Sequence, residues 1–343
     1  MELHFTRTNG PVDDLIDRLI RHAGEVRHPD FVREMILAAL KSGQENEDRI
    51  DLKIMNTTLK EMRFTSKVFS PYRGVRKVTV FGSARTRAEE PIYRMAQEFG
   101  KRLSGAGYMV ITGGGPGIMQ AVNEGAGSEN SFGVNIRLPF EQQMNPVLLN
   151  NPRAITYKYF FNRKVAFLKE SDAVVLFPGG FGTLDEAMET LTLVQTGKRA
   201  PLPLLLLDEP GGTYWTRYIE FLKEELLLNG YISKTDLDLF ERLESLDEAV
   251  QRIRLFYSRY HSLRYVGEKL VIRLSSGLET EAVEELSARF VDILVPPGEI
   301  FLSKALPAES DEPELGHLPR LVLDFDRSDF ARLRHLIDAI NRF

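Results

Sequence analysis

Short runs of consecutive apolar residues alternate with longer amphipathic segments along the middle of the chain. The runs lie at 77–82, 108–112, 132–138, 173–177 and 202–207, and the amphipathic segments at 89–104, 117–127, 157–170, 183–197 and 213–228. Such runs are typical of strands buried on both faces of a parallel sheet, and the segments between them of helices. Repeated βα units of this length predict a doubly wound, Rossmann-like α/β fold, in which ligands bind at the carboxyl ends of the strands.

The two ends of the chain show different patterns. Apolar residues recur at helical spacing between 11 and 70, and SPYRG at 70–74 resembles a linker. From about residue 263 the order strand, helix, strand, strand, helix indicates a small α+β (βαββα) domain, similar to half of a ferredoxin-like or ACT-like module. We therefore predict a helical N-terminal region (1–70), a Rossmann-like central domain (71–262) and a C-terminal α+β domain (263–343).

Composition removes several classes of protein from consideration. The chain is mildly acidic, with a net charge of −5 and no basic block, so a nucleic-acid-binding surface is not expected. It has no cysteine, which excludes disulfides and thiolate chemistry, and its six histidines lack the spacing of a metal centre. Neither a signal-peptide core nor a run of about 18 apolar residues occurs, so we expect a cytoplasmic protein without membrane contact.

Three of the predicted strands end in loops that are rich in glycine or small polar residues. These loops read FGSAR (81–85), TGGGPGIM (112–119) and PGGFGT (178–183). A glycine turn that opens a helix directs free backbone N–H groups and the positive end of the helix dipole at one point, which suits a phosphate. Any one loop could instead be a tight turn without a ligand. Because all three lie at one edge of the predicted sheet, we expect anion or ribose contacts there, Ser83 included.

The second loop does not fit the common nucleotide-binding fingerprints. Gly113 and Gly115 match the first two positions of G-x-G-x-x-G, but the third is Ile118, and the following strand lacks the acidic residue that would hold an adenosine ribose. The chain also has no G-x-x-x-x-G-K-[ST] sequence. We therefore expect neither NAD nor an ATPase phosphate loop.

The charged residues Arg163, Lys164 and Glu186 lie near these loops, and each has more than one interpretation. Arg163 and Lys164 are set into the otherwise apolar segment 157–170, where a basic pair could be a solvated face, a salt bridge or, beside two phosphate loops, a ligand site. Thr183 and Glu186 fit the capping box T-x-x-E, so Glu186 could fold back on the end of its own helix or could face a ligand.

The three motifs GGGPGIM, FFNRK and PGGFGTLDE together resemble the LOG (Lonely Guy) family. This family was long mislabelled as lysine decarboxylases, and its characterised members are nucleotide phosphoribohydrolases. The family pattern P-G-G-x-G-T-x-x-E is complete from Pro178 to Glu186, and the Arg-Lys pair precedes it at the expected distance. The resemblance covers about residues 76–230, and the flanking parts are closer in plan to longer bacterial relatives.

The resemblance implies hydrolysis of the N-glycosidic bond of a nucleoside 5′-monophosphate, giving free base and ribose 5-phosphate, with Glu186 and Arg163 as the catalytic pair. Breaking this bond develops oxocarbenium charge on the ribose, which a carboxylate stabilises, and negative charge on the departing base, which a guanidinium balances. Asp185 should point away from Glu186, whereas Glu189, one turn on, should help to bind ribose. The other expected substrate contacts are Ser83, Gly114, Gly115, Lys164, Gly179, Gly180, Gly182, Thr183 and Thr192.

The 5′-phosphate is expected on the backbone N–H groups of Gly114, Gly115, Gly182 and Thr183. The identity of the base stays open, because Tyr157, Phe160 and Phe161 could stack on any purine or pyrimidine. No lysine lies in the setting that a pyridoxal-phosphate decarboxylase needs, so neither lysine decarboxylation nor a cofactor is expected.

Two further expectations come from the family. Molybdenum-cofactor carriers resemble it in fold, so a non-catalytic nucleotide or cofactor carrier is the alternative function, and fold alone does not separate the two. Short members of the family are dimers that assemble around their active sites, which implies a homo-oligomer here. The segment 157–170 is apolar on more than one side, as expected if a second chain covers part of it.

Overall fold

The computed structural model describes residues 5–139 and 143–343, and the chain divides into two compact units, one up to Phe64 and one from Thr65 to Phe343. The first unit holds α1 (Pro11–His22), α2 (Pro29–Glu45) and most of α3 (Arg49–Phe69), in agreement with the helical spacing there. Arg33 of α2 is buried and pairs with Asp13 of α1. Within the described residues, every helix is too short or too polar to cross a bilayer.

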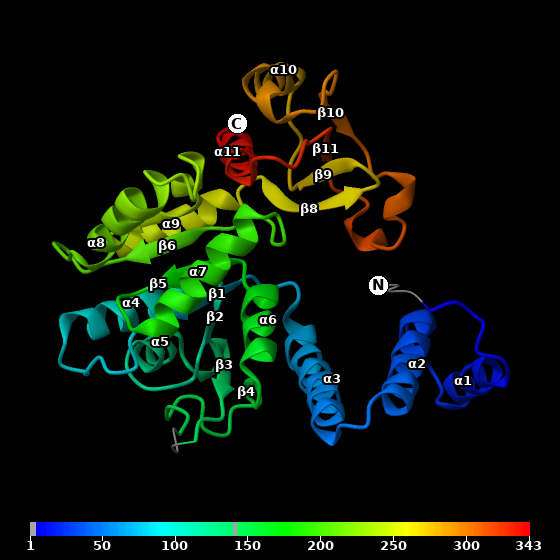
Figure 1. Cartoon of the computed structure of the whole chain (residues 1–343). Coiled ribbons are helices and arrows are strands. Elements are labelled where there is room, and N and C mark those ends of the chain that lie inside the picture. The colour runs from blue at the N-terminus through cyan, green and yellow to red at the C-terminus, as the bar shows by residue number, and fades with distance from the viewer. Residues whose placement is uncertain (1–4, 140–142) are drawn as a thin grey trace. The chain divides into compact units, whose positions relative to one another are not determined.

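The second unit is built on a seven-stranded sheet in which all strands are parallel (Figure 1). The strands are β1 (Lys77–Phe81), β2 (Met109–Thr112), β3 (Ser131–Ile136), β4 (Ala154–Tyr157), β5 (Ala173–Leu176), β6 (Leu204–Leu207) and β7 (Glu241–Leu243). Their spatial order is β4-β3-β2-β1-β5-β6-β7, so the predicted doubly wound α/β fold is confirmed. The order reverses between β1 and β5, and such a switch point leaves a crevice at the carboxyl ends of the strands.

Helices cover both faces of this sheet. One face carries α4 (Pro91–Gly105), α5 (Ile118–Ala126) and α9 (Leu246–Phe256), and the other carries α6 (Phe160–Glu170), α7 (Phe181–Gln195) and α8 (Tyr214–Phe221). Val175 of β5 packs in the first layer, whereas Val174 and Leu176 pack in the second. This alternation explains why the strand reads as a continuous apolar run.

The sequence analysis did not predict β4 and β7, the two edge strands of the seven-stranded sheet. β4 ends at Tyr157, the first residue of the predicted helix 157–170, and α6 begins only at Phe160; β7 is three residues long with Glu241 and Arg242 among them. An edge strand has a neighbour on one side only and needs less apolar cover, so neither segment carries the run that identified the central strands. The predicted helix 213–228 is α8 followed by a π-helical segment, Leu222–Leu227.

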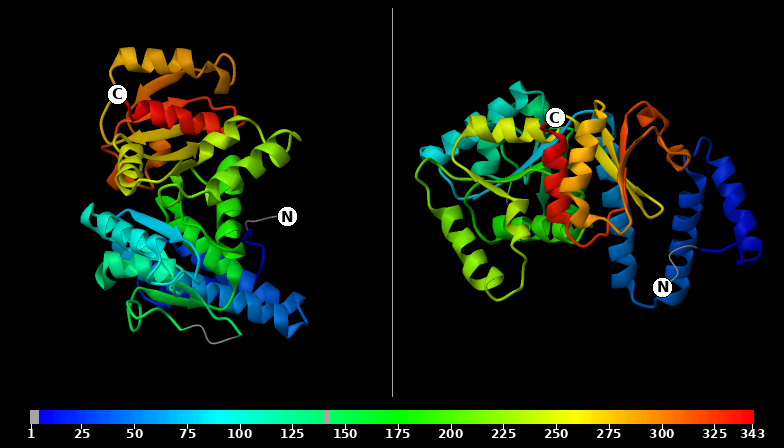
Figure 2. Two further views of the ribbon diagram at one scale, coloured as in Figure 1. Left: turned by 90° about the vertical axis from the view of Figure 1, so that its left-hand side faces the viewer. Right: turned by 90° about the horizontal axis from the view of Figure 1, so that it is seen from above.

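A second, antiparallel sheet follows in the chain. Its strands β8 (Tyr260–Val266), β9 (Lys269–Leu274), β10 (Ile300–Ser303) and β11 (Arg320–Leu323) have the order β10-β11-β9-β8, and α10 (Thr280–Arg289) and α11 (Phe330–Ile340) cover one face (Figure 2). The predicted order βαββα is present, but β8 precedes it. β8 is an edge strand whose residues are mostly half-buried, and its pairing with β9 is irregular between Tyr260 and Ser262, so its sequence shows no continuous apolar run.

The acidic stretch 308–316 belongs to the other face of this second sheet. Arg273 and Arg320 face each other across β9 and β11, and both donate to the carboxylate of Glu309, at 2.7 and 3.2 Å. All three side chains are almost fully buried. Burial opposes ionisation of Glu309, but the Leu306 amide and the two arginines outweigh it and lower the pKa of this carboxyl to about 2. The acidic stretch therefore stabilises the second sheet, because Glu309 joins β9 to β11 through their arginines.

The C-terminal sheet and helices contact the end of α7. Gly197 follows this helix with φ +68°, and a Cβ atom there would lie 2.0 Å from the ring of Phe330 in α11, so only glycine fits without displacement. Arg334 of α11 donates to the carbonyl of Leu202 at 3.0 Å. The helix that begins at the crevice thus ends against α11.

Candidate active site

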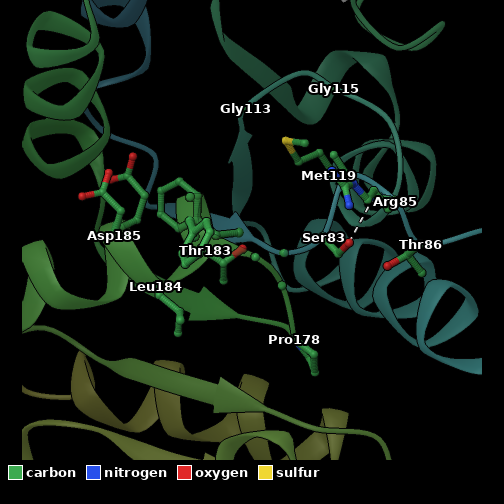
Figure 3. A pocket seen from close by; sticks show the side chains of 18 of the residues that line it. Ser83, Arg85, Thr86, Gly113, Gly115, Met119, Pro178, Thr183, Leu184 and Asp185 are labelled. Atoms are coloured by element: carbon green, nitrogen blue, oxygen red, sulfur yellow. Dashed lines mark hydrogen bonds between the residues drawn. The ribbon is translucent and has the colours of Figure 1, made fainter. Parts of the chain in front are cut away.

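A cleft of about 960 Å³ opens at the carboxyl ends of β1, β2 and β5, beside the switch point of the sheet (Figure 3). Its walls are the loop 82–86 after β1, the loop 113–115 after β2, and the start of α7 with the loop before it, 178–186. Phe160 and Arg163 reach it from α6. All three loops that the sequence singled out therefore meet in one cavity.

Ser83 joins the three loops through its backbone. Its amide donates to the carbonyl of Pro178 at 3.1 Å, and its carbonyl accepts from the amide of Ile118 at 3.0 Å. Glycine is required for this approach, because a Cβ atom on Gly117, where φ is +68°, would lie 2.3 Å from the carbonyl oxygen of Ser83. The loops are thus fixed to one another before any ligand arrives.

The backbone amides proposed for the phosphate differ in availability. The N–H of Gly114 donates to a threonine hydroxyl in its own loop at 3.0 Å, and the N–H of Thr183 donates to the carbonyl of Gly180 at 3.0 Å. Among the described residues, the amides of Gly115 and Gly182 have no acceptor, and both residues line the cleft. An anion at the start of α7 would therefore meet the Gly115 and Gly182 amides, together with the helix dipole.

The start of α7 decides between the two interpretations of Glu186. The helix begins at Phe181 with Gly180 as its N-cap residue, and no side chain caps it. Thr183 is therefore the third helical residue, and Glu186 lies in the second turn, too far along the helix to reach the capping position. The capping-box interpretation is wrong, and the carboxylate of Glu186 faces the cleft instead.

Glu186 is a buried acid with a perturbed ionisation. Only 7% of its side chain is exposed. Burial raises the pKa of Glu186 to about 7; the charges of Lys164 and Arg163 lower it, and those of Glu189 and Asp185 raise it. A carboxyl with this pKa exchanges its proton near neutral pH, which is the behaviour of a general acid or base.

Arg163 reaches the same cleft from α6. Its Nε donates to the carbonyl of Val134 at 2.9 Å, and its guanidinium lies 5.0 Å from the centre of the Phe167 ring. A Cβ atom on Gly113 would lie 2.6 Å from Nη2, so the glycine makes room for the guanidinium. Burial lowers the pKa of Arg163, but a guanidinium stays charged in proteins. In the part of the chain that the structure describes, no ion pair joins Arg163 to Glu186.

The other predicted contacts divide into two groups. Ser83, Gly115, Gly179, Gly180, Gly182 and Thr183 line the cleft. Gly114, Lys164, Glu189 and Thr192 are outside its lining. Lys164 binds Asp185 and Glu189, each at 2.8 Å, and Thr192 is exposed, three turns along α7.

Asp185 lies where Glu189 was expected. Asp185 is part of the cleft wall (Figure 3), and Glu189 is bound to Lys164 outside the lining. The sequence placed the start of α7 two residues too late, at 183. That error does not explain the exchange, because the angles between Asp185, Glu186 and Glu189 are the same wherever the helix begins. Which of them faces the cleft depends on how α7 packs against its neighbours.

The aromatic residues expected to stack on a base are also separated. Phe160 lines the cleft, whereas Tyr157 is fully buried in β4 and Phe161 stacks on Tyr159 outside the lining. The sequence did not single out the lining residues Thr86, Glu90 and Asn135, and Met119 and Phe181 were included only as parts of their motifs. Thr86 lies in the loop after β1, so its position after a predicted strand was the available signal, whereas Glu90 lies at the start of α4, inside the predicted helix 89–104, and had no such signal.

The central part of the chain is similar in sequence to a known protein family and to characterised proteins. Residues 119–253 match a family described as "possible lysine decarboxylase". The chain is 25% identical over 181 residues to the cytokinin riboside 5′-monophosphate phosphoribohydrolase LOG3 of Arabidopsis thaliana, covering 52% of this chain and 81% of that protein. It is also 25% identical over 190 residues to LOG of Oryza sativa subsp. japonica, covering 54% and 75%.

Solved structures give matches over the same share of the chain. The X-ray structure of TM1055 is 27% identical, with a TM-score of 0.39, and the match covers 52% of this chain and 99% of that one. The molybdenum cofactor carrier protein of Chlamydomonas reinhardtii is 19% identical, with a TM-score of 0.37, over 52% and 96%. With the family match, which includes both Arg163 and Glu186, the sequence relatives confirm the resemblance that the motifs predicted.

Proposed function

We propose that this chain, a relative of the LOG phosphoribohydrolases, hydrolyses the N-glycosidic bond of a nucleoside 5′-monophosphate and releases free base and ribose 5-phosphate. One observation carries the proposal. Arg163 and the buried acid Glu186 come from different helices and line the same cleft as the unpaired amides of two glycine loops. This set supplies an anion site, a cation and a carboxylate within one cavity.

Each group has a role that the chemistry of the bond requires. The 5′-phosphate binds at the start of α7, on the amides of Gly115 and Gly182. The ionised carboxylate of Glu186 stabilises the oxocarbenium charge on the ribose and accepts a proton from the water whose oxygen attacks C1′. The bonding electrons of the C1′–N bond leave with the base, where the Arg163 guanidinium balances the charge until the base takes a proton from solvent.

A non-catalytic nucleotide or cofactor carrier on the same fold is the second candidate. Such a protein needs the glycine loops but gains nothing from a buried acid. Burying Glu186 costs folding free energy whenever this side chain is ionised, because water no longer solvates it. The presence of a buried acid that lowers the stability of the fold, in the wall of the cleft, therefore favours an enzyme over a carrier.

Incubating the protein with a panel of nucleoside 5′-monophosphates should release free base from at least one of them. The panel contains AMP, GMP, CMP and UMP together with a cytokinin riboside 5′-monophosphate, and chromatography measures the base. The corresponding nucleosides serve as controls, and we expect their kcat/KM to be lower by at least about 100-fold, because they lose the binding energy of the phosphate.

Intact nucleotide across the whole panel would eliminate the enzyme. If calorimetry then showed tight nucleotide binding, the carrier would be the correct function. Equal rates with nucleosides and nucleotides would instead show that the glycine loops do not hold a phosphate during the reaction.

We further propose that the protein is a homo-oligomer whose subunit contact includes α6 beside the cleft. Phe160, Phe161 and Val165 project from this helix and are about half exposed. Light scattering during size-exclusion chromatography should give a mass of at least twice 39.0 kDa. Val165→Glu should weaken the association, because it places a charge in an apolar contact.

Val291→Glu is the matched control for this change. Val291 is also an exposed valine, but it lies in the C-terminal sheet-and-helix region, away from α6. Its substitution should leave the mass unchanged. A monomeric wild-type protein with full activity at nanomolar dilution would contradict the proposed contact.

A further inference from the structure

Three charged side chains, those of Lys164, Asp185 and Glu189, gather on one side of Glu186. The ammonium of Lys164 in α6 lies 2.8 Å from the carboxylate of Asp185, 2.8 Å from that of Glu189 and 3.8 Å from that of Glu186. All three carboxylates belong to the first three turns of α7. One cation thus faces three anions, and among the described residues Arg163 is the other cation that lowers the pKa of Glu186.

The contacts of Lys164 leave it little freedom to bind a ligand. An ammonium group has three hydrogens, and two of them are directed at Asp185 and Glu189. The third side of the group faces Glu186, and Lys164 is absent from the lining of the cleft. A phosphate at the glycine loops would have to displace two short ion pairs to reach this side chain. The arrangement thus argues against the role of substrate ligand that the motif implied.

We infer that Lys164 is a positioning residue for the reaction proposed above: it acts through Glu186 by neutralising the carboxylates of α7, which favours the ionised form of Glu186 and holds its carboxylate towards the cleft. The inference rests on the proposed function for its effect on turnover. The electrostatic effect on Glu186 itself is independent of which substrate the cleft takes.

The charges around Glu186 fix the direction of the effect. Burial raises the pKa of Glu186; Lys164 and Arg163 on α6 lower it, and Glu189 and Asp185 on α7 raise it. Removing the ammonium leaves three carboxylates of α7 against Arg163 alone, whose Nε is already bound to the carbonyl of Val134. Glu186 would then hold its proton to a higher pH, and a protonated carboxyl can neither stabilise an oxocarbenium ion nor accept a proton from water.

The variant Lys164→Met tests this role, because methionine keeps most of the length and packing of the side chain but removes the charge. Two measurements are made against pH. One is kcat/KM with the best nucleotide, and the other is the ¹³C NMR titration of the Glu186 carboxyl carbon in protein labelled at glutamate. The Glu186 signal is identified by its absence in Glu186→Gln. We expect both midpoints to rise by at least about one pH unit, with most of the activity returning above the new midpoint.

Two further variants make the test specific. Lys169→Met removes the same charge from the same helix, but within the described residues this ammonium pairs with the adjacent Glu170 alone, so neither midpoint should move. Glu189→Gln removes one of the competing carboxylates and should lower both midpoints. Circular dichroism and the melting temperature verify that each variant is folded.

The outcomes separate this inference from its rivals. A rise in KM at every pH, with an unchanged NMR midpoint, would make Lys164 a substrate ligand. A fall in melting temperature with unchanged midpoints would show that Lys164 only stabilises the fold. If the wild-type protein hydrolysed no nucleotide, the proposed function would fail, whereas the NMR titration would still decide whether Lys164 controls the ionisation of Glu186.

Discussion

Replacing Glu186 by glutamine should lower kcat by about 10³-fold while leaving the protein folded. The amide has nearly the same size and shape as the carboxyl group, but it carries no charge and accepts no proton, so stabilisation of the oxocarbenium ion and activation of water are both lost. Losses of this size are typical when a general base or an electrostatic stabiliser is removed. The measurement is steady-state release of base, with the protein concentration high enough to detect the residual rate.

The same variant should be more stable than the wild type above neutral pH. In the unfolded chain Glu186 ionises near pH 4.5, whereas burial raises its pKa to about 7 in the folded protein. The folded state therefore resists losing this proton, and wild-type stability falls as the pH rises from about 4.5 through 7. Glutamine does not ionise, so its advantage should grow over that window and approach ~3 kcal/mol at pH 8.

Denaturant unfolding at pH 5 and pH 8 measures this difference. An active site that costs stability is expected where function requires a buried charge. Activity close to that of the wild type would show that Glu186 does not take part in the reaction. A variant that is less stable than the wild type at pH 8 would show that the carboxylate has a structural partner.

Changing Arg163 to lysine should lower kcat/KM by about 10²- to 10³-fold, even though the positive charge is kept. Lysine cannot present a planar fork of donors, and its ammonium cannot at once bind the carbonyl of Val134 and reach the base, the two roles proposed for the guanidinium. The loss of that one hydrogen bond should cost only about 1–2 kcal/mol of folding free energy. Activity should therefore fall far more than the melting temperature.

Arg153→Lys is the matched control for this change. Arg153 is also partly buried, donates to the carbonyl of Ser128 and lies over the ring of Tyr72, but it is absent from the cleft. Its replacement should cost similar stability and leave kcat/KM nearly unchanged. Equal losses of activity in the two variants would indicate that Arg163 serves the fold and not the reaction.

The sequence predicted the centre of the fold better than its edges. β1, β2, β3, β5 and β6 are close to their predicted positions, because a strand buried on both faces must be apolar throughout. β4, β7 and β8 are edge strands with only one neighbour each, so none of the three shows the expected pattern. The helices followed from their spacing, but α7 begins two residues earlier than the capping motif indicated.

The sequence predicted which loops form the candidate site, but not how their side chains are arranged. That PGGFGT would meet two other loops followed from the topology of a parallel sheet. That Lys164 would bind Asp185 and Glu189 depends on how α6 and α7 lie against each other, and a single sequence contains no information about that angle. The same limit explains why Asp185 and Glu189 exchanged their expected places.

The close packing of Gly197 against Phe330 restricts how the sequence can change over evolutionary time. The two residues are 133 positions apart, yet a methyl group on one would overlap the ring of the other. A side chain at position 197 therefore requires a smaller residue at position 330, or a shift of the Phe330 ring or of α11 relative to α7. α7 carries Glu186 at its opposite end, so a sequence change in the C-terminal region that moves α11 can also change the geometry of the cleft. Residue changes at positions 197 and 330 are therefore expected to be correlated, although the two positions are far apart in the sequence.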